Sequence, residues 1–185
     1  IIDVTQYKHK ASYEFAYLIN AKRNKDQAIS THSAEHTSFN YGGITYSKTG
    51  IVFDYLMAYL GEEVYDSCMH QYFEKWKFKH PQPQDLRAIF EKETQKDLSW
   101  FFDGIITTTD KIDFKIISAT DSQSEDNNTL IKVKNKGKIH GPFSISGIKD
   151  GKITTTQWYE AIENKESLPF PKGDYDSYRI DAELD

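Results

Sequence analysis

The sequence has little cysteine, no long apolar run and no excess of basic residues, and each absence excludes a class of protein. Cys68 is the single cysteine, so the chain has no internal disulfide framework, and secreted, periplasmic and cytoplasmic locations all stay open. The mean hydropathy is −0.67, and no apolar run approaches the ~18 residues of a membrane span. Basic residues number 12 against 15 acidic ones before Lys111 and 11 against 13 from there on, which argues against a nucleic-acid-binding protein.

The chain begins at Ile1 without methionine or a signal-like segment, which leads us to expect a piece of a longer protein. Its first half has helical periodicity. Ala11, Phe15, Leu18 and Ile19 recur at helical spacing, and the polar stretch 22–40 predicts a long loop. Residues 46–60 are apolar on nearly every side, which predicts a helix buried all round, ended by Gly61 in a left-handed conformation.

Three further helices are predicted before residue 110. Glu62 and Glu63 open the first, whose apolar stripe is Tyr65, Cys68, Met69, Tyr72, Phe73 and Trp76. Proline at 83 starts the second, and Asp97 is placed to cap the third. Cys68 lies within the stripe and is expected in the core.

After Thr109 the apolar period changes from 3.6 to 2, which indicates β-strands. Ile112, Phe114 and Ile116 alternate with polar residues, as do residues 130–134, and a further run covers 143–148. Asp150-Gly151 is a strong hairpin signal. The sequence therefore predicts an α+β chain: short antiparallel helices over 1–110, then a small antiparallel β-sandwich over 111–185.

Six histidines prompt a search for a metal site, and one candidate emerges. His32, Glu35 and His36 match the H-x-x-E-H inverted zinc motif, in which the two imidazoles lie one helical turn apart and the carboxylate serves as base. The flanking residues are poor helix formers without an apolar stripe, so a coincidental match in a polar loop is favoured. His80 follows Lys75, Lys77 and Lys79 and is interpreted as part of a cation cluster at a helix C-terminus.

Tyr46 is the other candidate functional residue. It follows Gly42-Gly43, expected to be flexible, and opens the most apolar helix, so its phenol could donate a hydrogen bond to a developing oxyanion. From the residues alone, an ordinary packing tyrosine is the favoured interpretation.

The order of several short motifs resembles the aminopeptidase N family of zinc metallopeptidases (gluzincins). The likeness runs from about Asp26 to Thr109 and is weaker through the β-half. The matching pieces are Tyr46-Ser47-Lys48-Thr49-Gly50 (the family has Tyr-Glu-Lys-Gly), Leu60-Gly61-Glu62-Glu63, Tyr72 with residues 76–81, Asp85-Leu86, and residues 97–102. The version Trp-Lys-Phe-Lys-His-Pro looks like the bacterial branch, and Ser47 departs from the family's glutamate.

This resemblance implies the late part of a thermolysin-like catalytic domain and the β-domain after it. In the family, the tyrosine that matches Tyr46 stabilises the oxyanion, while an H-E-x-x-H helix and a later glutamate bind zinc. No H-E-x-x-H occurs here, and Glu14 lacks the context of the third ligand, so we expect no metal site in this piece.

The expected parent is a zinc peptidase that acts on peptides, and its zinc-binding helix is expected in a missing N-terminal part. The piece alone would be inactive and zinc-free. The alternative is a noncatalytic interaction module with the same architecture.

Overall fold

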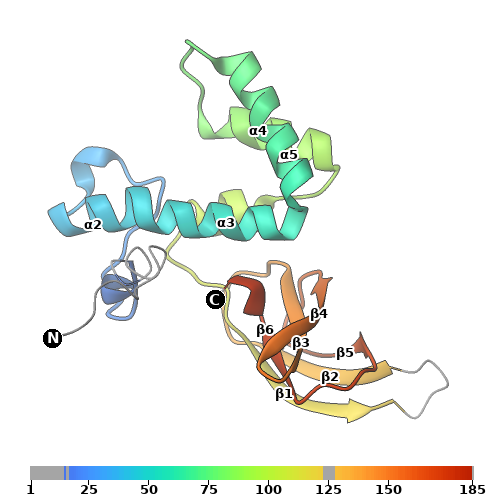
Figure 1. Cartoon of the computed structure of the whole chain (residues 1–185). Coiled ribbons are helices and arrows are strands. Elements are labelled where there is room, and N and C mark those ends of the chain that lie inside the picture. Colours follow the sequence, from blue (N-terminus) through green and yellow to red (C-terminus); the bar gives the residue numbers. More distant parts are fainter. Residues whose placement is uncertain (1–14, 16, 123–127, 185) are drawn as a thin grey trace, which may run out of the picture. The chain divides into compact units, whose positions relative to one another are not determined.

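The computed structural model describes residues 15, 17–122 and 128–184 (Figure 1). Contacts divide the chain into two compact units, Ile1–Thr109 and Asp110–Asp185, called here the helical unit and the β unit. The first contains short helices and the second contains antiparallel sheets, so the predicted α+β class is confirmed. Ala11 and Glu14, which entered the sequence argument, lie outside the described residues.

In the helical unit, one long helical rod carries the candidate tyrosine. It consists of α2 (Ser38–Gly42), the π-helical turn η3 (Gly43–Lys48) and α3 (Thr49–Leu60). The rod begins eight residues before Tyr46, because the hydroxyl of Thr37 accepts a hydrogen bond from the backbone N–H of Asn40 at 3.2 Å. The expectation that Gly42-Gly43 forms a flexible entry is therefore wrong: both glycines are right-handed helical, with φ of −68° and −66°.

The prediction that residues 46–60 are buried on every side is also wrong for this chain. Within α3 only Leu56 is fully buried, and the other apolar side chains are half-buried. Gly61 ends α3 at a positive φ of 84°, as a glycine allows, but its ψ of 144° differs from the left-handed helical value that we expected. Periodicity reports which residues are apolar, and it carries no information on which neighbours are present to cover them.

The next two helices follow the predicted start signals. They are α4 (Glu62–Trp76) and α5 (Pro83–Thr94). At the start of α5, the Asp85 carboxylate accepts a hydrogen bond from the backbone N–H of Gln82 at 2.8 Å, which completes a capping box. Cys68 of α4 is fully buried, as predicted, and burial raises the pKa of its thiol. Phe73 departs from the predicted core stripe, because its side chain is 59% exposed.

The last helical segment is π-helical: η4 (Trp100–Ile105). The backbone N–H of Ser99 donates to the Asp97 carboxylate at 2.8 Å, but the N-cap of this segment is Ser99 and not Asp97, so the predicted N-cap is wrong by two residues. Aromatic rings of α3 lie edge-on against η4, with ring centroids 5.2 Å apart for Phe53 and Phe101 and 5.9 Å apart for Tyr59 and Trp100. These contacts fasten the rod to η4.

The β unit consists of two three-stranded antiparallel sheets. One has the order β1-β2-β5 and the other β4-β3-β6. The strands are β1 (Phe114–Asp121), β2 (Asn128–Asn135), β3 (Phe143–Lys149), β4 (Lys152–Tyr159), β5 (Lys165–Pro171) and β6 (Ser177–Ile180), followed by the turn η5 (Ala182–Leu184). Asp150 and Gly151 connect β3 to β4 with φ of 50° and 72°, which confirms the predicted hairpin.

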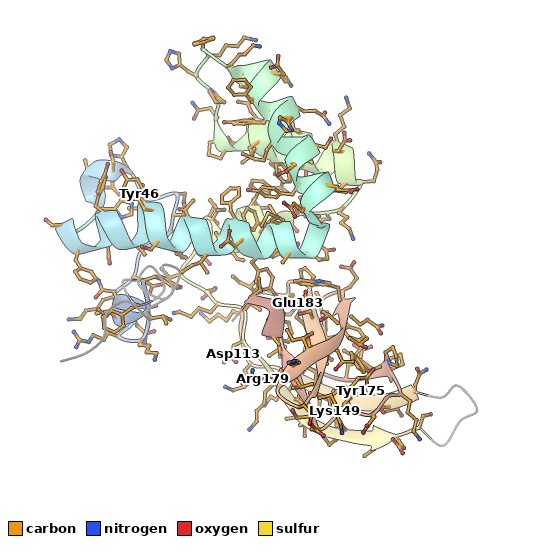
Figure 2. All side chains as sticks on the ribbon, in the orientation of Figure 1. Tyr46, Asp113, Lys149, Tyr175, Arg179 and Glu183 are labelled. Atoms are coloured by element: carbon orange, nitrogen blue, oxygen red, sulfur yellow. The ribbon has the colours of Figure 1, made fainter. Side chains whose placement is uncertain are left out.

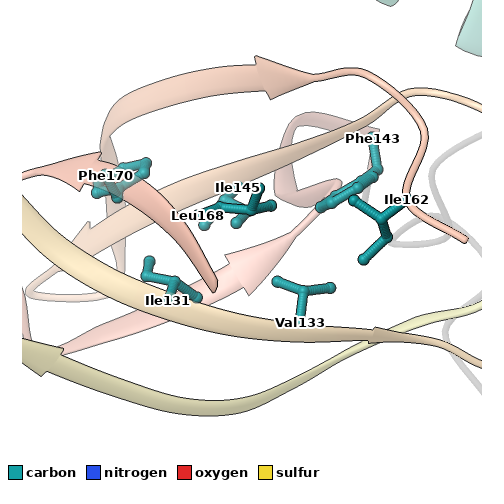
Figure 3. Close-up of a cluster of buried hydrophobic side chains, with 7 residues drawn as sticks. All are labelled: Ile131, Val133, Phe143, Ile145, Ile162, Leu168 and Phe170. Carbon is teal, nitrogen blue, oxygen red and sulfur yellow. The ribbon is translucent and has the colours of Figure 1, made fainter. Parts of the chain in front are cut away.

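Buried side chains from both sheets form one core in this unit. Figure 3 shows Ile131 and Val133 of β2, Phe143 and Ile145 of β3, Leu168 and Phe170 of β5, and Ile162. The ring of Phe114 stacks on Phe143 with centroids 4.1 Å apart. The alternation seen along 130–134 thus reflects one buried and one exposed face of β2.

Candidate functional site

Tyr46 lies in the middle of η3 and points away from the packed side of this turn (Figure 2). Its side chain is 62% exposed, whereas Ile44, Ser47 and Lys48 in the same turn are 1%, 6% and 2% exposed. Among the described residues, nothing forms a hydrogen bond with its hydroxyl. The buried side chains therefore fix the backbone of this turn. The exposed Tyr46 hydroxyl can still donate and accept hydrogen bonds.

The π-helical turn changes how this part of the rod presents its side chains. The backbone N–H of Thr49 reaches back to the carbonyl of Ile44, five residues earlier, and the Thr49 hydroxyl donates to the same oxygen at 3.1 Å. Such an extra residue shifts all later side chains around the helix relative to the earlier ones, and single π-turns are frequent at functional sites. The local geometry thus separates the orientation of Tyr46 from that of the α3 side chains.

A row of aromatic rings continues from Tyr46 toward the start of the rod. The Tyr41 and Tyr46 ring centroids are 6.2 Å apart and the His36 and Tyr41 centroids 6.3 Å apart, both with interplanar angles of 78°. Tyr41 is 44% exposed and Phe39 52% exposed. The exposed surface beside Tyr46 therefore includes the ring of Tyr41, an aromatic surface suited to contact with a bound organic ligand.

The inverted zinc motif does not form the helix that metal binding would need. Residues 33–35 make a single 3-10 turn, η2 (Ser33–Glu35), and His36 is extended with ψ of 137°. The Nδ1 atom of His32 accepts a hydrogen bond from the backbone N–H of Ala34 at 3.2 Å. His32 and His36 therefore do not share a helix face, and within residues 15, 17–122 and 128–184 no three His, Cys, Asp or Glu side chains cluster as metal ligands.

The remaining basic cluster has a local structural role. The Lys79 ammonium donates to the carbonyl oxygen of Lys75 at 2.7 Å, in the last turn of α4, and His80 is exposed beyond it. Cations at a helix C-terminus satisfy free carbonyls and oppose the helix dipole. This agrees with the predicted cation cluster.

Sequence reasoning missed two buried polar residues beside the candidate site. Asn40, which is 2% exposed, connects residues 20–27 to α2, and Lys48, also 2% exposed, is buried two residues after Tyr46. A signal for Lys48 was present, because it is the only Asp, Glu, Lys or Arg between Glu35 and Asp54.

No helix in the described part of the chain is long and apolar enough to cross a membrane.

Comparisons with known proteins assign this arrangement to a family. The model of the peptidase family M1 domain matches residues 4–105, more than half of the chain. Aminopeptidase N of Streptomyces lividans is 32% identical over 81 residues, which cover 40% of this chain and 10% of that protein. The chain thus spans about a tenth of the length of this curated relative.

A solved structure shows the same fold at lower sequence identity. The crystal structure of Legionella pneumophila aminopeptidase A in complex with aspartic acid matches with a TM-score of 0.54 and 16% identity, over 75% of this chain and 16% of that one. The family match, which covers the helical unit and the segment with Tyr46, agrees with the resemblance drawn from the motifs. The chain belongs to peptidase family M1.

Proposed function

We propose that the chain is part of a peptidase in which Tyr46 donates a hydrogen bond to the oxyanion of the tetrahedral intermediate. The observation that carries the proposal is an exposed phenol whose hydroxyl makes no hydrogen bond among the described residues, on a turn in which Ile44, Ser47 and Lys48 are buried. A donor held by a packed backbone needs little reorganisation when negative charge develops on the carbonyl oxygen, and one such donor is worth about 3 kcal/mol in the transition state.

The catalytic metal is proposed to come from elsewhere in the protein. The M1 family is typically zinc-dependent, but the described residues of this chain do not fit a zinc site, so no step is assigned to zinc here. The S. lividans relative is an aminopeptidase, and by analogy the substrate class is peptides cleaved at the N-terminus. On this proposal the helical unit is part of the catalytic domain, the β unit is a separate domain, and the 185 residues alone are inactive.

The test compares two hydroxyl deletions in the full-length enzyme, Tyr46→Phe and Tyr41→Phe. Both remove a phenol oxygen from an exposed ring of the same rod and leave the ring contact between them possible. Tyr46→Phe should lower kcat by about 10²–10³ with KM nearly unchanged, because the lost interaction forms only in the transition state. Tyr41→Phe should leave kcat near the wild-type value.

Two results would refute this proposal in different ways. An unchanged kcat in Tyr46→Phe would remove the oxyanion role while leaving the peptidase assignment in place. A folded wild-type protein that hydrolyses no N-terminal peptide bond would instead favour the noncatalytic interaction module. Zinc content of the full-length protein, measured by elemental analysis, separates an inactive preparation that lacks metal from a protein without a metal site.

A further inference from the structure

Lys48 is a fully enclosed cation in the same π-helical turn as Tyr46. Its side chain is 2% exposed, while the phenol two residues earlier is 62% exposed. Burial of a charged ammonium is strongly unfavourable unless partners replace the lost water, so a lysine persists in such a place only with specific contacts. The contacts of Lys48 therefore identify the parts of the helical unit to which this turn is bound.

The ammonium of Lys48 binds the backbone just after the other π-helical segment, η4. Its Nζ atom donates to the carbonyl oxygen of Thr108 at 3.2 Å, a contact between residues 60 positions apart. The backbone N–H and the hydroxyl of Thr108 both donate to the carbonyl of Gly104, at 3.1 and 2.7 Å, so Thr108 closes the helical segment that begins at η4. Lys48 thus places a positive charge beside the backbone that follows the C-terminal end of η4, where the helix dipole is negative.

A second contact encloses the same ammonium. The Nζ atom lies 5.9 Å from the centroid of the Tyr17 ring, within the range of a cation–π interaction. Burial, and secondarily the charge of Asp26, raises the pKa of the Tyr17 phenol to about 12, so this ring is neutral at physiological pH. Lys48 therefore joins three segments of the helical unit: the rod, the end of the η4 segment and the helical residues 17–21.

We propose that Lys48 is the positioning residue that fixes the direction of the Tyr46 phenol. The turn has one buried and one exposed side; Lys48 anchors the buried side to the Thr108 carbonyl, and Tyr46 projects from the exposed side. A displacement of about 1 Å at a catalytic group can cost as much as 10²-fold in rate. The inference rests on the proposed function of Tyr46 and adds the residue through which the fold sets its geometry.

The closing experiment is a double-mutant cycle in the full-length enzyme. Lys48→Met keeps most of the length of the side chain and removes the charge and the donors. It should lower kcat by about tenfold or more with little change in KM, and Lys48→Arg should retain more activity than Lys48→Met. In the Tyr46→Phe background, Lys48→Met should cause no further loss, because a positioning residue acts only through the group that it positions.

The matched control is Lys96→Met, which removes a half-buried lysine that follows α5 and contacts the far end of the rod. The Lys96 ammonium donates to the Tyr59 hydroxyl at 3.0 Å and lies 4.7 Å from that ring's centroid. This variant should leave kcat near the wild-type value. An equal fractional loss from Lys48→Met in both Tyr46 backgrounds, or no loss in any folded Lys48 variant, would overturn the inference. If Lys48→Met fails to fold, the same cycle with Lys48→Arg decides.

Amide hydrogen exchange tests the anchor without any reference to catalysis. Exchange of the amides of residues 43–49 should become faster in Lys48→Met and stay unchanged in Lys96→Met. Unchanged exchange in Lys48→Met would refute the anchor even if the protein is an active peptidase. Faster exchange in a protein without peptidase activity would refute the proposed function and keep the anchor, so the two failures are distinguishable.

Discussion

Replacement of Asn40 by aspartate should weaken the start of the rod that carries Tyr46. The Asn40 amide nitrogen donates to the carbonyl of Lys25 at 2.8 Å and to Oε1 of Gln27 at 2.9 Å, and its oxygen accepts from Asn20 at 2.6 Å. The side chain thus lies at the centre of a polar network between residues 20–27 and α2. Asn40→Asp keeps its shape and turns two donated hydrogen bonds into contacts between oxygen atoms.

The magnitude follows from these contacts. A hydrogen bond contributes about 1 kcal/mol net, and a buried group that loses its partner costs about 1–3 kcal/mol. Rotation of the Gln27 amide can restore one contact by donating to the new carboxylate, whereas the Lys25 carbonyl cannot donate. The expected loss in the free energy of unfolding of the helical unit is therefore about 2–4 kcal/mol at pH 7.

The assay is urea-induced unfolding followed by far-ultraviolet circular dichroism, which the helices dominate. The control is Asn24→Asp, the same chemical change on an exposed residue of the same loop, which should shift stability by less than about 0.5 kcal/mol. In Asn40→Asp, the protonated form of the new carboxyl can donate to the Lys25 carbonyl. The pKa of this carboxyl is therefore higher in the folded protein than in the unfolded chain. The loss should accordingly shrink as the pH falls toward about 4. Wild-type stability of Asn40→Asp at pH 7 would refute this account.

Two further predictions concern the β unit. A Cβ atom added at Gly147 would lie 2.6 Å from two ring atoms of Tyr175. Gly147→Ala should therefore lower the free energy of unfolding, measured by thermal unfolding, by about 1–3 kcal/mol, and Tyr175→Leu should restore most of it. An unaltered melting temperature in Gly147→Ala would contradict this packing. Burial raises the pKa of Tyr159, whose hydroxyl donates to the Pro169 carbonyl at 2.7 Å, to about 12. Its contribution to stability is therefore complete below pH 10 and lost between about pH 10 and 12. The free energy of unfolding of Tyr159→Phe should fall less steeply between about pH 10 and 12 than that of the wild type. The same slope in both proteins would show that Tyr159 is not the group responsible.

Local signals in the sequence predicted much of the fold because they act between close neighbours. Pro83 at the start of α5 and the turn Asp150-Gly151 each act on the backbone of close neighbours, so their effect is readable without the rest of the chain. The burial of Cys68 followed from the apolar stripe of α4. The family was recognisable for a related reason, since its motifs lie in a fixed order along the chain.

The errors arose where burial and helix geometry depend on distant residues. Gly42-Gly43 was expected to be flexible, but the Thr37 cap and the continuing rod hold both glycines helical. The π-turn around Tyr46 has no signature in the pattern, because its extra residue is accommodated by packing of the whole unit. The exposed Phe73 and the half-buried α3 show the same limitation of periodicity.

By itself, the sequence determined the helix boundaries with strong caps, the change from helices to strands after Thr109, and the order of motifs that marks the M1 family. These features rest on interactions between residues near each other in the chain. Only the tertiary structure decided that Tyr46 is exposed while Lys48 is enclosed, and that Lys48 reaches the carbonyl of Thr108. That contact joins residues 60 positions apart, and it forms because a buried charge needs a polar partner, which only the fold brings near.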